Sequence, residues 1–351
     1  MPLINYEALD SSTDVTTTKT LLYEAIPLTG TIVSGTYSDE NIKNFTHGMF
    51  QAVYDYPYLS SSANHIFDLT VGYSSNSVVS GSISVVQESK KINMYNQFAQ
   101  VLLGYTGSNN VVREFESDLT LDGVGKLQNT FMINFSRLIT KDQIKKGSFS
   151  LIVGTGSWTT PFASASTLTD VSASATAGTT NTLGGDYGVL FDNSAGDDGG
   201  VARGLVFYQA GIAILGTGSW DGVTDFNSGS LGIPAGGYTA AQSLASASIS
   251  GSCDALRHRI KNISFNNTTE INSSIYFCRV PHNKYNYTSN PTYLSSSQIV
   301  VKSIGTDTPI SYITTIGLYS SNNELLAIAK LSEPLRKDPS NEITLRVRLD
   351  Y

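Results

Sequence analysis

A faultless alternation of apolar and polar side chains runs through the stretch Glu342-Ile343-Thr344-Leu345-Arg346-Val347-Arg348-Leu349-Asp350-Tyr351. Its apolar members are Ile343, Leu345, Val347 and Leu349, and the residues between them are polar or charged. A period of two is the pattern of a β-strand that has one buried and one solvated face. We therefore expect this stretch to form a strand that closes a sheet, and we take residues 271–351 as the best guide to the fold.

Four more strands are expected before this one, at 275–280, 298–304, 311–319 and 324–331. The last two flank the turn sequence Ser320-Ser321-Asn322-Asn323, so they predict a β-hairpin. The number and the spacing of these strands predict that residues 271–351 form a C-terminal antiparallel β-sandwich.

The composition limits the class of protein. The chain has 351 residues, for which we expect two or three domains. Hydrophobic residues make up 40% and charged residues 15%, which allows a sizeable core and excludes a chain kept disordered by its charge. A net charge of -7 argues against a nucleic-acid partner, because such proteins carry a basic surface. The many Ser, Thr, Gly and Tyr residues are typical of β-rich extracellular or assembly proteins.

Residues 1–160 combine strand and helix patterns and predict an N-terminal α+β domain. Helical spacing predicts one helix at 39–56 and a second at 91–103, with Gly104 just past its end. Thr140 and Gln143 have the spacing of a capping box and predict a short third helix. Strands are expected at 21–26, 31–33, 131–136 and 149–153.

Between residues 161 and 203 the chain is rich in Ala, Ser and Thr and has almost no charge before Asp186. We expect a low-complexity insertion or a long loop there, and another loop at 74–84. Residues 204–270 are expected to continue the N-terminal domain as a β-rich segment. The predicted fold is therefore mainly β (α+β), with two or three short helices in the N-terminal domain and a sandwich at the C-terminus.

The pentapeptide Gly-Thr-Gly-Ser-Trp occurs twice, at 154–158 and at 216–220. Each copy follows an apolar run, and the two copies contain both tryptophans of the chain. The repeat predicts either two hairpin corners that meet within one domain or the remains of a duplication. Two copies are too few to predict a solenoid.

No pattern in the sequence predicts a catalytic, cofactor or metal site. The four histidines are not spaced as a pair of helical metal ligands, and the acidic turn around Asp192, Asp197 and Asp198 lacks the spacing of an EF-hand loop. The glycine-rich segments match neither a phosphate-binding loop nor a nucleophile elbow. We therefore expect no enzymatic activity, no cofactor and no bound metal.

The cysteines and the apolar runs bear on where the protein is found. Cys253 and Cys278 are either two buried thiols or one disulfide, and the sequence leaves both open. The N-terminus lacks the basic and apolar parts of a secretory signal, and the longest apolar run, 204–216, is too short to cross a bilayer. We expect a protein that is made in a cytoplasm, stays soluble until it joins its partners and binds no membrane.

Several blocks of the chain resemble one family of proteins. They are Tyr276-Phe277-Cys278-Arg279-Val280, Tyr287-Thr288-Ser289-Asn290-Pro291-Thr292-Tyr293, residues 312–330 with the closing strand, and residues 91–97 and 131–146. These blocks are similar to virion structural proteins of contractile-tailed bacteriophages, particularly cyanophage-like myoviruses. The resemblance implies a structural subunit of the virion, in the tail, baseplate or neck, that assembles with other virion proteins and with copies of itself. It skips residues 161–200 and carries over no active-site residue.

Aromatic side chains supply the candidate assembly contacts, which are Tyr285, Tyr287, Tyr293, Trp158 and Trp220. Three other functions stay open. The tyrosines and the segment 161–200 also suit a host-receptor or glycan-binding module at an exposed tail position. A capsid-associated protein would have the same composition, and a glycan hydrolase would need two carboxylates that meet only in the fold.

Overall fold

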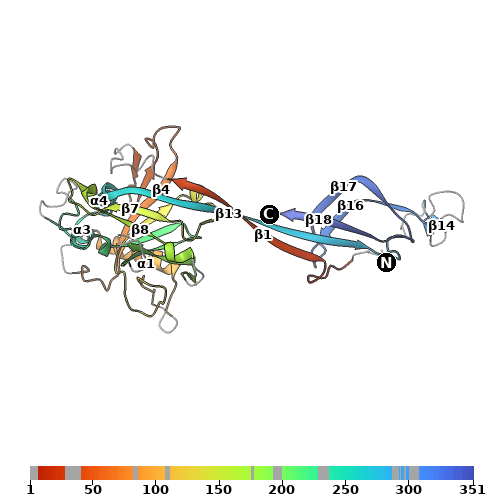
Figure 1. Cartoon of the computed structure of the whole chain (residues 1–351), viewed down its shortest axis with the longest axis horizontal. Helices are drawn as coiled ribbons and strands as arrows, with labels where there is room; N and C mark the ends of the chain where they lie inside the picture. Colours follow the sequence, from red (N-terminus) through yellow and green to blue (C-terminus); the bar gives the residue numbers. More distant parts are fainter. Residues whose placement is uncertain are drawn as a thin grey trace. The chain divides into compact units, whose positions relative to one another are not determined.

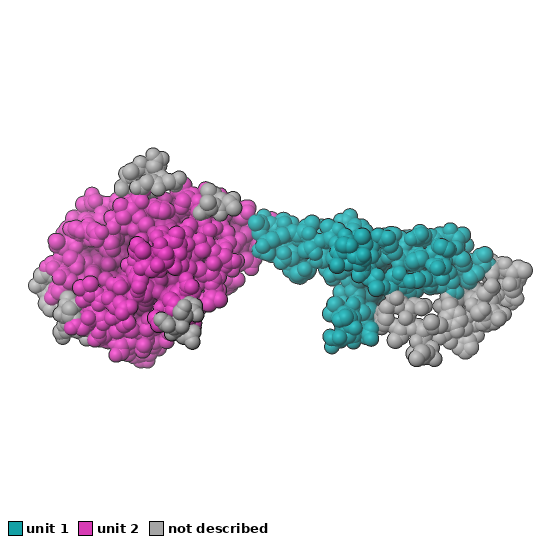
Figure 2. Space-filling view, turned by 90° about the horizontal axis from the view of Figure 1, so that it is seen from below, with its two compact units in different colours: residues 1–21, 270–351 teal, residues 22–269 magenta. Residues whose placement is uncertain are grey.

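The computed structural model describes residues 7–27, 41–81, 86–106, 111–174, 178–192, 200–227, 237–286, 292, 294–295, 298–299 and 308–351. The chain forms two compact units, a smaller unit of residues 1–21 and 270–351 and a larger unit of residues 22–269 (Figure 2). Both boundaries fall within strands, β1 (Val15–Pro27) and β13 (Ile260–Val280). Residues 1–21, which the sequence grouped with the N-terminal domain, belong instead to the smaller unit.

The larger unit is built on an antiparallel sheet with helices packed against it (Figure 1). Its strands lie in the order β13-β7-β8-β10-β11-β12-β5-β4-β3-β2, with β6 paired to β13 and β9 paired to β10. The strands are β2 (Ile42–Asn44), β3 (Gln51–Tyr54), β4 (His65–Tyr73), β5 (Asn129–Phe135), β6 (Gln143–Ile144), β7 (Ser150–Gly154), β8 (Ala165–Thr169), β9 (Thr180–Thr182), β10 (Gly185–Asp192), β11 (Ala202–Phe207) and β12 (Ile212–Gly216).

The helices of the larger unit are short. They are α1 (Glu88–Leu102), α2 (Arg137–Thr140), α3 (Ala240–Ser246) and α4 (Ile249–Arg259), with 3-10 turns η3 (Pro161–Ala163), η4 (Val171–Ser174) and η5 (Thr217–Trp220). In the part of the chain that the structure describes, no helix has the length and apolar character to cross a membrane.

The central strands of this sheet are apolar on both faces. Phe131 and Ile133 of β5 belong to one buried cluster, whereas Met132 between them belongs to a second cluster. The first cluster also contains Leu256 of α4, and the second contains Leu102 of α1. Because alternate residues of a strand point to opposite faces, α4 packs on one face of the sheet and α1 on the other.

The helix predicted at 91–103 is confirmed by α1, which begins slightly earlier, at Glu88. Gly104 follows its end at a φ of +81°, and its N–H donates to the carbonyl of Ala99 at 3.1 Å. Only glycine adopts this backbone without strain, so Gly104 ends the helix as predicted. The strands predicted at 131–136 and 149–153 are confirmed by β5 and β7.

The helix predicted at 39–56 is wrong. Strands β2 and β3 occupy this region and pair with each other, and β3 pairs with β4 so that Val53 lies opposite Phe67. Gly48 lies between the two strands at a φ of +61°, a conformation that interrupts any helix. The apolar residues at helical spacing thus come from two separate strands, and pairing with the distant β4 overrides the local pattern.

The capping box proposed at Thr140 and Gln143 is also wrong. The helix α2 comes before it and ends at Thr140, and Lys141 adopts a positive φ of 52°. Gln143 begins β6 and lies opposite Thr268 of β13. Pairing with β13 therefore determines the conformation at Gln143, and the four-residue capping pattern does not.

Residues 161–203, expected as an insertion or a long loop, carry strands β8, β9 and β10 instead. In β8, Ser166 and Leu168 are buried, and β8 pairs with both β7 and β10. Small uncharged residues such as Ser, Thr and Ala carry no signal of burial in the sequence, yet they fit a sheet that is covered on both faces. The loop predicted at 74–84 has neither helix nor strand over its described residues, 74–81.

The smaller unit is also antiparallel. Its strands are the first part of β1, the last part of β13, β14 (Leu294–Ser295), β15 (Gln298–Ile299), β16 (Ser311–Tyr319), β17 (Leu325–Lys337) and β18 (Ile343–Asp350). The closing strand predicted from the alternation is confirmed by β18, which pairs with β13 from Ser273 opposite Asp350 to Val280 opposite Ile343. The predicted hairpin is confirmed by β16 and β17, and these two strands form a sheet of their own. The described strands do not close into a sandwich, and the strand predicted at 31–33 lies outside the described residues.

Candidate functional site

Trp220 is a core residue. Its side chain is 2% exposed, and its ring lies 5.3 Å from that of Phe131 and 5.0 Å from that of Phe226, measured between centroids. The ring Nε1 donates a hydrogen bond to the carbonyl of Gly154 at 3.2 Å. This burial leaves Trp220 almost no surface to offer to another chain.

The hydrogen bond from Trp220 to Gly154 joins the two Gly-Thr-Gly-Ser-Trp copies. The two copies therefore contact each other within one unit, as the first alternative expects, although the second copy forms the 3-10 turn η5 and not a hairpin corner. The alternative of a duplication stays a prediction. Arg259, at the end of α4, reinforces the junction because its guanidinium donates to the carbonyls of Gly154 (3.2 Å), Gly156 (2.8 Å), Asp225 (2.9 Å) and Phe226 (3.0 Å). Arg259 is fully buried, and desolvation lowers its pKa to about 10.

Trp158 is half-buried and largely engaged by its own chain. Its ring stacks on that of His258 with centroids 4.1 Å apart, and its carbonyl lies 3.0 Å from Nε2 of the same histidine. Its backbone N–H donates to Oδ2 of Asp225 at 2.9 Å. One face of the indole is thus occupied, and the role of Trp158 as an assembly contact stays a prediction.

Of the three tyrosine candidates, Tyr287 and Tyr293 lie outside the described residues. Tyr285 is half-buried in the smaller unit at a φ of +61°, and burial raises the pKa of its phenol, with a smaller contribution from Glu7. Its carbonyl accepts a hydrogen bond from Ser311 Oγ at 3.2 Å. The structure therefore places Tyr285 beside the start of β16, and its role as a contact remains a prediction.

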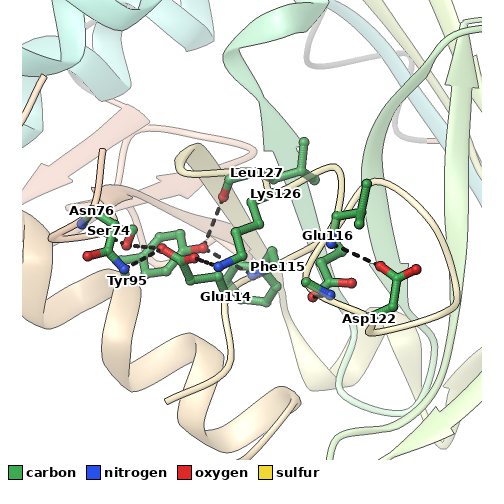
Figure 3. Close-up of polar contacts among 11 residues, drawn as sticks. Ser74, Asn76, Tyr95, Glu114, Phe115, Glu116, Asp122, Lys126 and Leu127 are labelled. Atoms are coloured by element: carbon green, nitrogen blue, oxygen red, sulfur yellow. Dashed lines mark hydrogen bonds and ion pairs between the residues drawn. The ribbon is translucent and has the colours of Figure 1, made fainter. Parts of the chain in front are cut away.

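A cavity of about 270 Å³ lies in the larger unit between Asn76, Thr106 and the segment 111–126. Figure 3 shows Glu114 at one side of it, within the group formed by Ser74, Asn76 and Lys126. Lys126 Nζ lies 2.7 Å from Oε2 of Glu114, Asn76 donates at 3.3 Å, and Ser74 also donates a hydrogen bond. Burial raises the pKa of Glu114, but the hydrogen bonds from Lys126, Ser74 and Asn76 outweigh it and leave the pKa below its usual value.

Glu116, two residues further on, has a different environment in the same cavity. It is 6% exposed, its Oε1 accepts the N–H of Gly123 at 3.0 Å, and its Oε2 has no hydrogen-bond partner among the described residues. Burial raises the pKa of this carboxyl, and the charges of Asp118 and Asp122 raise it further. The wall of the cavity therefore holds a carboxylate whose second oxygen is buried and lacks a hydrogen bond.

The fold holds this segment firmly through Tyr95 of α1. The Tyr95 phenol is 1% exposed, donates to the carbonyl of Leu127 and accepts the N–H of Phe115, both at 3.0 Å (Figure 3). Glu116 has no companions for metal binding, because no group of three or more His, Cys, Asp or Glu side chains is arranged to hold a metal ion in the described ranges. No sequence pattern predicts this cavity, since a single Glu between ordinary loop residues matches no motif.

The second candidate site is the surface of the hairpin β16–β17. Near its turn, Tyr319, Leu325, Leu326 and Ile328 are 45%, 48%, 69% and 56% exposed, and we call these four residues the apolar tip. Tyr319 lies opposite Leu325, and Gly317 lies opposite Ile328, so Tyr319, Leu325 and Ile328 share one face of the ribbon. A Cβ on Gly317 would lie 2.8 Å from Cε2 of Tyr319, so the glycine makes room for the ring.

The smaller unit has very little apolar interior to accompany this surface. Among its described residues, the buried hydrophobic side chains are Val280, Leu345 and Val347, and the three apolar clusters of the chain contain none of them. Its most buried side chain is a lysine, Lys337, whose Nζ donates to the carbonyls of His282 (3.2 Å) and Asp338 (2.8 Å). The sequence signal for the apolar tip was the run Leu325-Leu326-Ala327-Ile328-Ala329, which predicts a buried strand and does not say what buries it.

Comparisons of this chain with protein-family models, with curated proteins and with solved structures found no match. No relative therefore supplies functional residues to carry over. The candidate function has to be argued from the apolar tip, from the cavity at Glu116 and from the sequence.

Proposed function

We propose that this chain is a structural subunit of a phage virion, which acts by assembling with neighbouring proteins. The observation that carries the proposal is the contrast, among the described residues of the smaller unit, between three buried hydrophobic side chains and an exposed apolar tip. A unit of about 100 residues that folds alone normally buries well over half of its surface in a core. Large exposed apolar patches on an otherwise polar surface are typical of protein–protein contacts.

The resemblance of the sequence to virion structural proteins of phages supports the proposal that this protein is part of a virion. Its blocks 276–280 and 312–330 fall on β13 and on the hairpin β16–β17 of the smaller unit. The proposal accordingly places the protein at the tail, baseplate or neck of a contractile-tailed phage, where the smaller unit makes contacts and the larger unit is a folded body.

The proposal includes the antiparallel sandwich for residues 271–351. Strands β13 and β18 would supply one layer, and β16 with β17 would supply part of the other. Two-stranded ribbons are marginally stable alone, so the second layer would become complete only when further strands or a partner cover it.

Mass spectrometry of purified virions tests the proposal. We expect the protein in the particle in a fixed number of copies, and a cryo-EM map should place the chain at the tail, baseplate or neck with the apolar tip covered. Absence of the protein from washed particles would contradict the proposal. A particle in which the apolar tip faces solvent would contradict the role given to the smaller unit.

A glycan-binding module is a second candidate, and the cavity at Glu116 favours it. The buried Oε2 of Glu116 lacks a hydrogen-bond donor among the described residues, and a sugar hydroxyl would supply one if the residues that cover this oxygen moved aside on binding. Binding of host envelope polysaccharide to the isolated protein, with loss of binding in Glu116→Gln and not in the exposed control Lys261→Ala, would support this candidate. Unaltered binding by Glu116→Gln would exclude the cavity as the binding site.

A further inference from the structure

We infer that the smaller unit completes its fold by pairing, through the apolar tip, with the smaller unit of another copy of this chain. The inference rests on the proposed assembly function and names the partner that covers this surface. It follows from three observations, which concern the missing interior, the area of the exposed patch and the charges.

The missing interior shows that the apolar tip needs a cover. Along β16 and β17 the residues from Ser311 to Arg336 are exposed or half-buried, and only Lys337 at the end is fully buried. A ribbon of two strands gains stability only when one of its faces packs against further apolar groups. The alternate residues Leu318 and Ala327 are half-buried, whereas the face that carries Tyr319, Leu325 and Ile328 is exposed, so a copy of the same face offers apolar packing for this second side.

The apolar tip supplies part of the area that a homodimer requires. Its four side chains, Tyr319, Leu325, Leu326 and Ile328, are between 45% and 69% exposed. With about 200 Å² for each fully exposed side chain, they present roughly 450 Å². A stable interface buries about 800 Å² on each partner, so two tips facing each other supply about half of it as an apolar centre and the polar residues around them supply the remainder.

The charges permit copies to meet through the smaller unit. It carries 9 Lys and Arg against 10 Asp and Glu, whereas the larger unit carries 13 and 19, the remainder of the chain's 22 and 29. A net charge of -1 on the smaller unit hardly opposes self-association, and a net charge of -6 on the larger unit disfavours contacts between larger units.

The charges near the apolar tip are also self-complementary. Lys330 lies opposite Thr315, on the same face as Ile328, and Glu324 lies at the turn beside Leu325. Neither Lys330 nor Glu324 has an ion-pair partner among the described residues. In an interface with two-fold symmetry each contact between two residues occurs twice, once in each direction. Glu324 of each copy can therefore face Lys330 of its partner.

The test compares one substitution in the apolar tip with a matched one in the larger unit. Leu326→Asp changes a leucine that is 69% exposed, and Leu138→Asp changes one on α2 that is 88% exposed. We expect the full-length chain to be a dimer or a higher oligomer at about 50 μM by light scattering. Leu326→Asp should raise the dissociation constant roughly 100-fold, because the buried charge occurs twice in each two-fold interface, and Leu138→Asp should leave it unchanged.

Limited proteolysis with a fold check by circular dichroism separates loss of pairing from loss of folding. In Leu326→Asp the larger unit should stay resistant while the hairpin β16–β17 is cleaved. A wild-type monomer with a protease-resistant smaller unit, or an oligomer that Leu326→Asp does not weaken, would overturn the inference. A monomer whose smaller unit becomes resistant only when another virion protein is added would overturn self-pairing and leave the proposed function standing.

Discussion

In the larger unit the rings of Phe131, Trp220 and Phe226 pack edge to face or tilted in the interior, whereas in the smaller unit Tyr312 and Tyr319 are 59% and 45% exposed. Both units are antiparallel β-structures from one chain, so their strands alone do not explain the difference. The units differ in what packs on their strands. In the larger unit helices pack on both faces of the sheet, whereas no helix covers the described part of β16 and β17. The comparison teaches that the larger unit is stabilised from within, and it motivates the proposal that the smaller unit depends on a neighbour.

Among substitutions that test this difference between the units, we expect the largest loss of stability at Phe131. It is fully buried, so Phe131→Ala should lower the free energy of unfolding of the larger unit by about 3–5 kcal/mol. Tryptophan fluorescence in a urea titration reports this unit selectively, because Trp158 and Trp220 both lie in it. The matched variant Tyr319→Ala should leave this transition in place, and an equal loss in both variants would break the comparison.

The next effect concerns the junction at Arg259. Arg259→Lys should cost about 2–3 kcal/mol, because an ammonium group cannot reach all four of the carbonyls that the guanidinium contacts. Lys261→Ala, two residues away and exposed, is the control and should change stability by less than about 0.5 kcal/mol. A loss in Arg259→Lys no larger than in this control would show that the two Gly-Thr-Gly-Ser-Trp corners do not depend on Arg259.

A smaller effect should appear as a dependence on pH. Lys91 of α1 is fully buried, its Nζ donates to the carbonyls of Leu244 and Ala247, and desolvation lowers its pKa to about 8. Between this value and the ordinary value of 10.5 the unfolded chain binds a proton that the folded chain does not, so Lys91 contributes a rise of stability with pH. Burial raises the pKa of Cys253 and Cys278 above the ordinary value of 9.0 and that of Tyr73 to about 12, and these groups act in the opposite direction. The effect of Lys91 is therefore measured between pH 8 and 9.5 as a difference from a variant that lacks this amine.

Lys91→Met provides the comparison for this pH effect. In urea titrations the free energy of unfolding of the wild type, taken relative to Lys91→Met, should rise by about 1–2 kcal/mol between pH 8 and 9.5, because the cysteines and tyrosines titrate alike in both chains. A difference between the two chains that stays constant over this range would contradict a depressed pKa at Lys91.

The parts of the fold that could be predicted from the sequence are those fixed by local pattern. The alternation from Ile343 to Leu349 predicted β18, the turn 320–323 predicted the hairpin, and Gly104 predicted the end of α1. One of the two interpretations of the repeat at 154–158 and 216–220 was that the copies meet, which they do, but the repeat did not reveal that Arg259 joins them.

The parts that could not be predicted depend on pairing between distant segments. Strands β2 and β3 form because β3 pairs with the distant β4, and β8 forms although its small uncharged side chains carry no periodic signal. The candidate sites were missed for related reasons. Leu325 to Ile328 has the pattern of a core strand, and Glu116 is distinguished only by the absence of a partner for Oε2 in the fold.

Hydrogen exchange at several protein concentrations tests most directly the claim that the smaller unit depends on a second copy. We predict that the backbone amides of β16 and β17 exchange slowly well above the dissociation constant and quickly well below it. The amides shared by β4 and β5 should be equally protected at both concentrations. Protection of β16 and β17 that is high and independent of concentration would contradict the account, because it would mean that the smaller unit is stable without a partner.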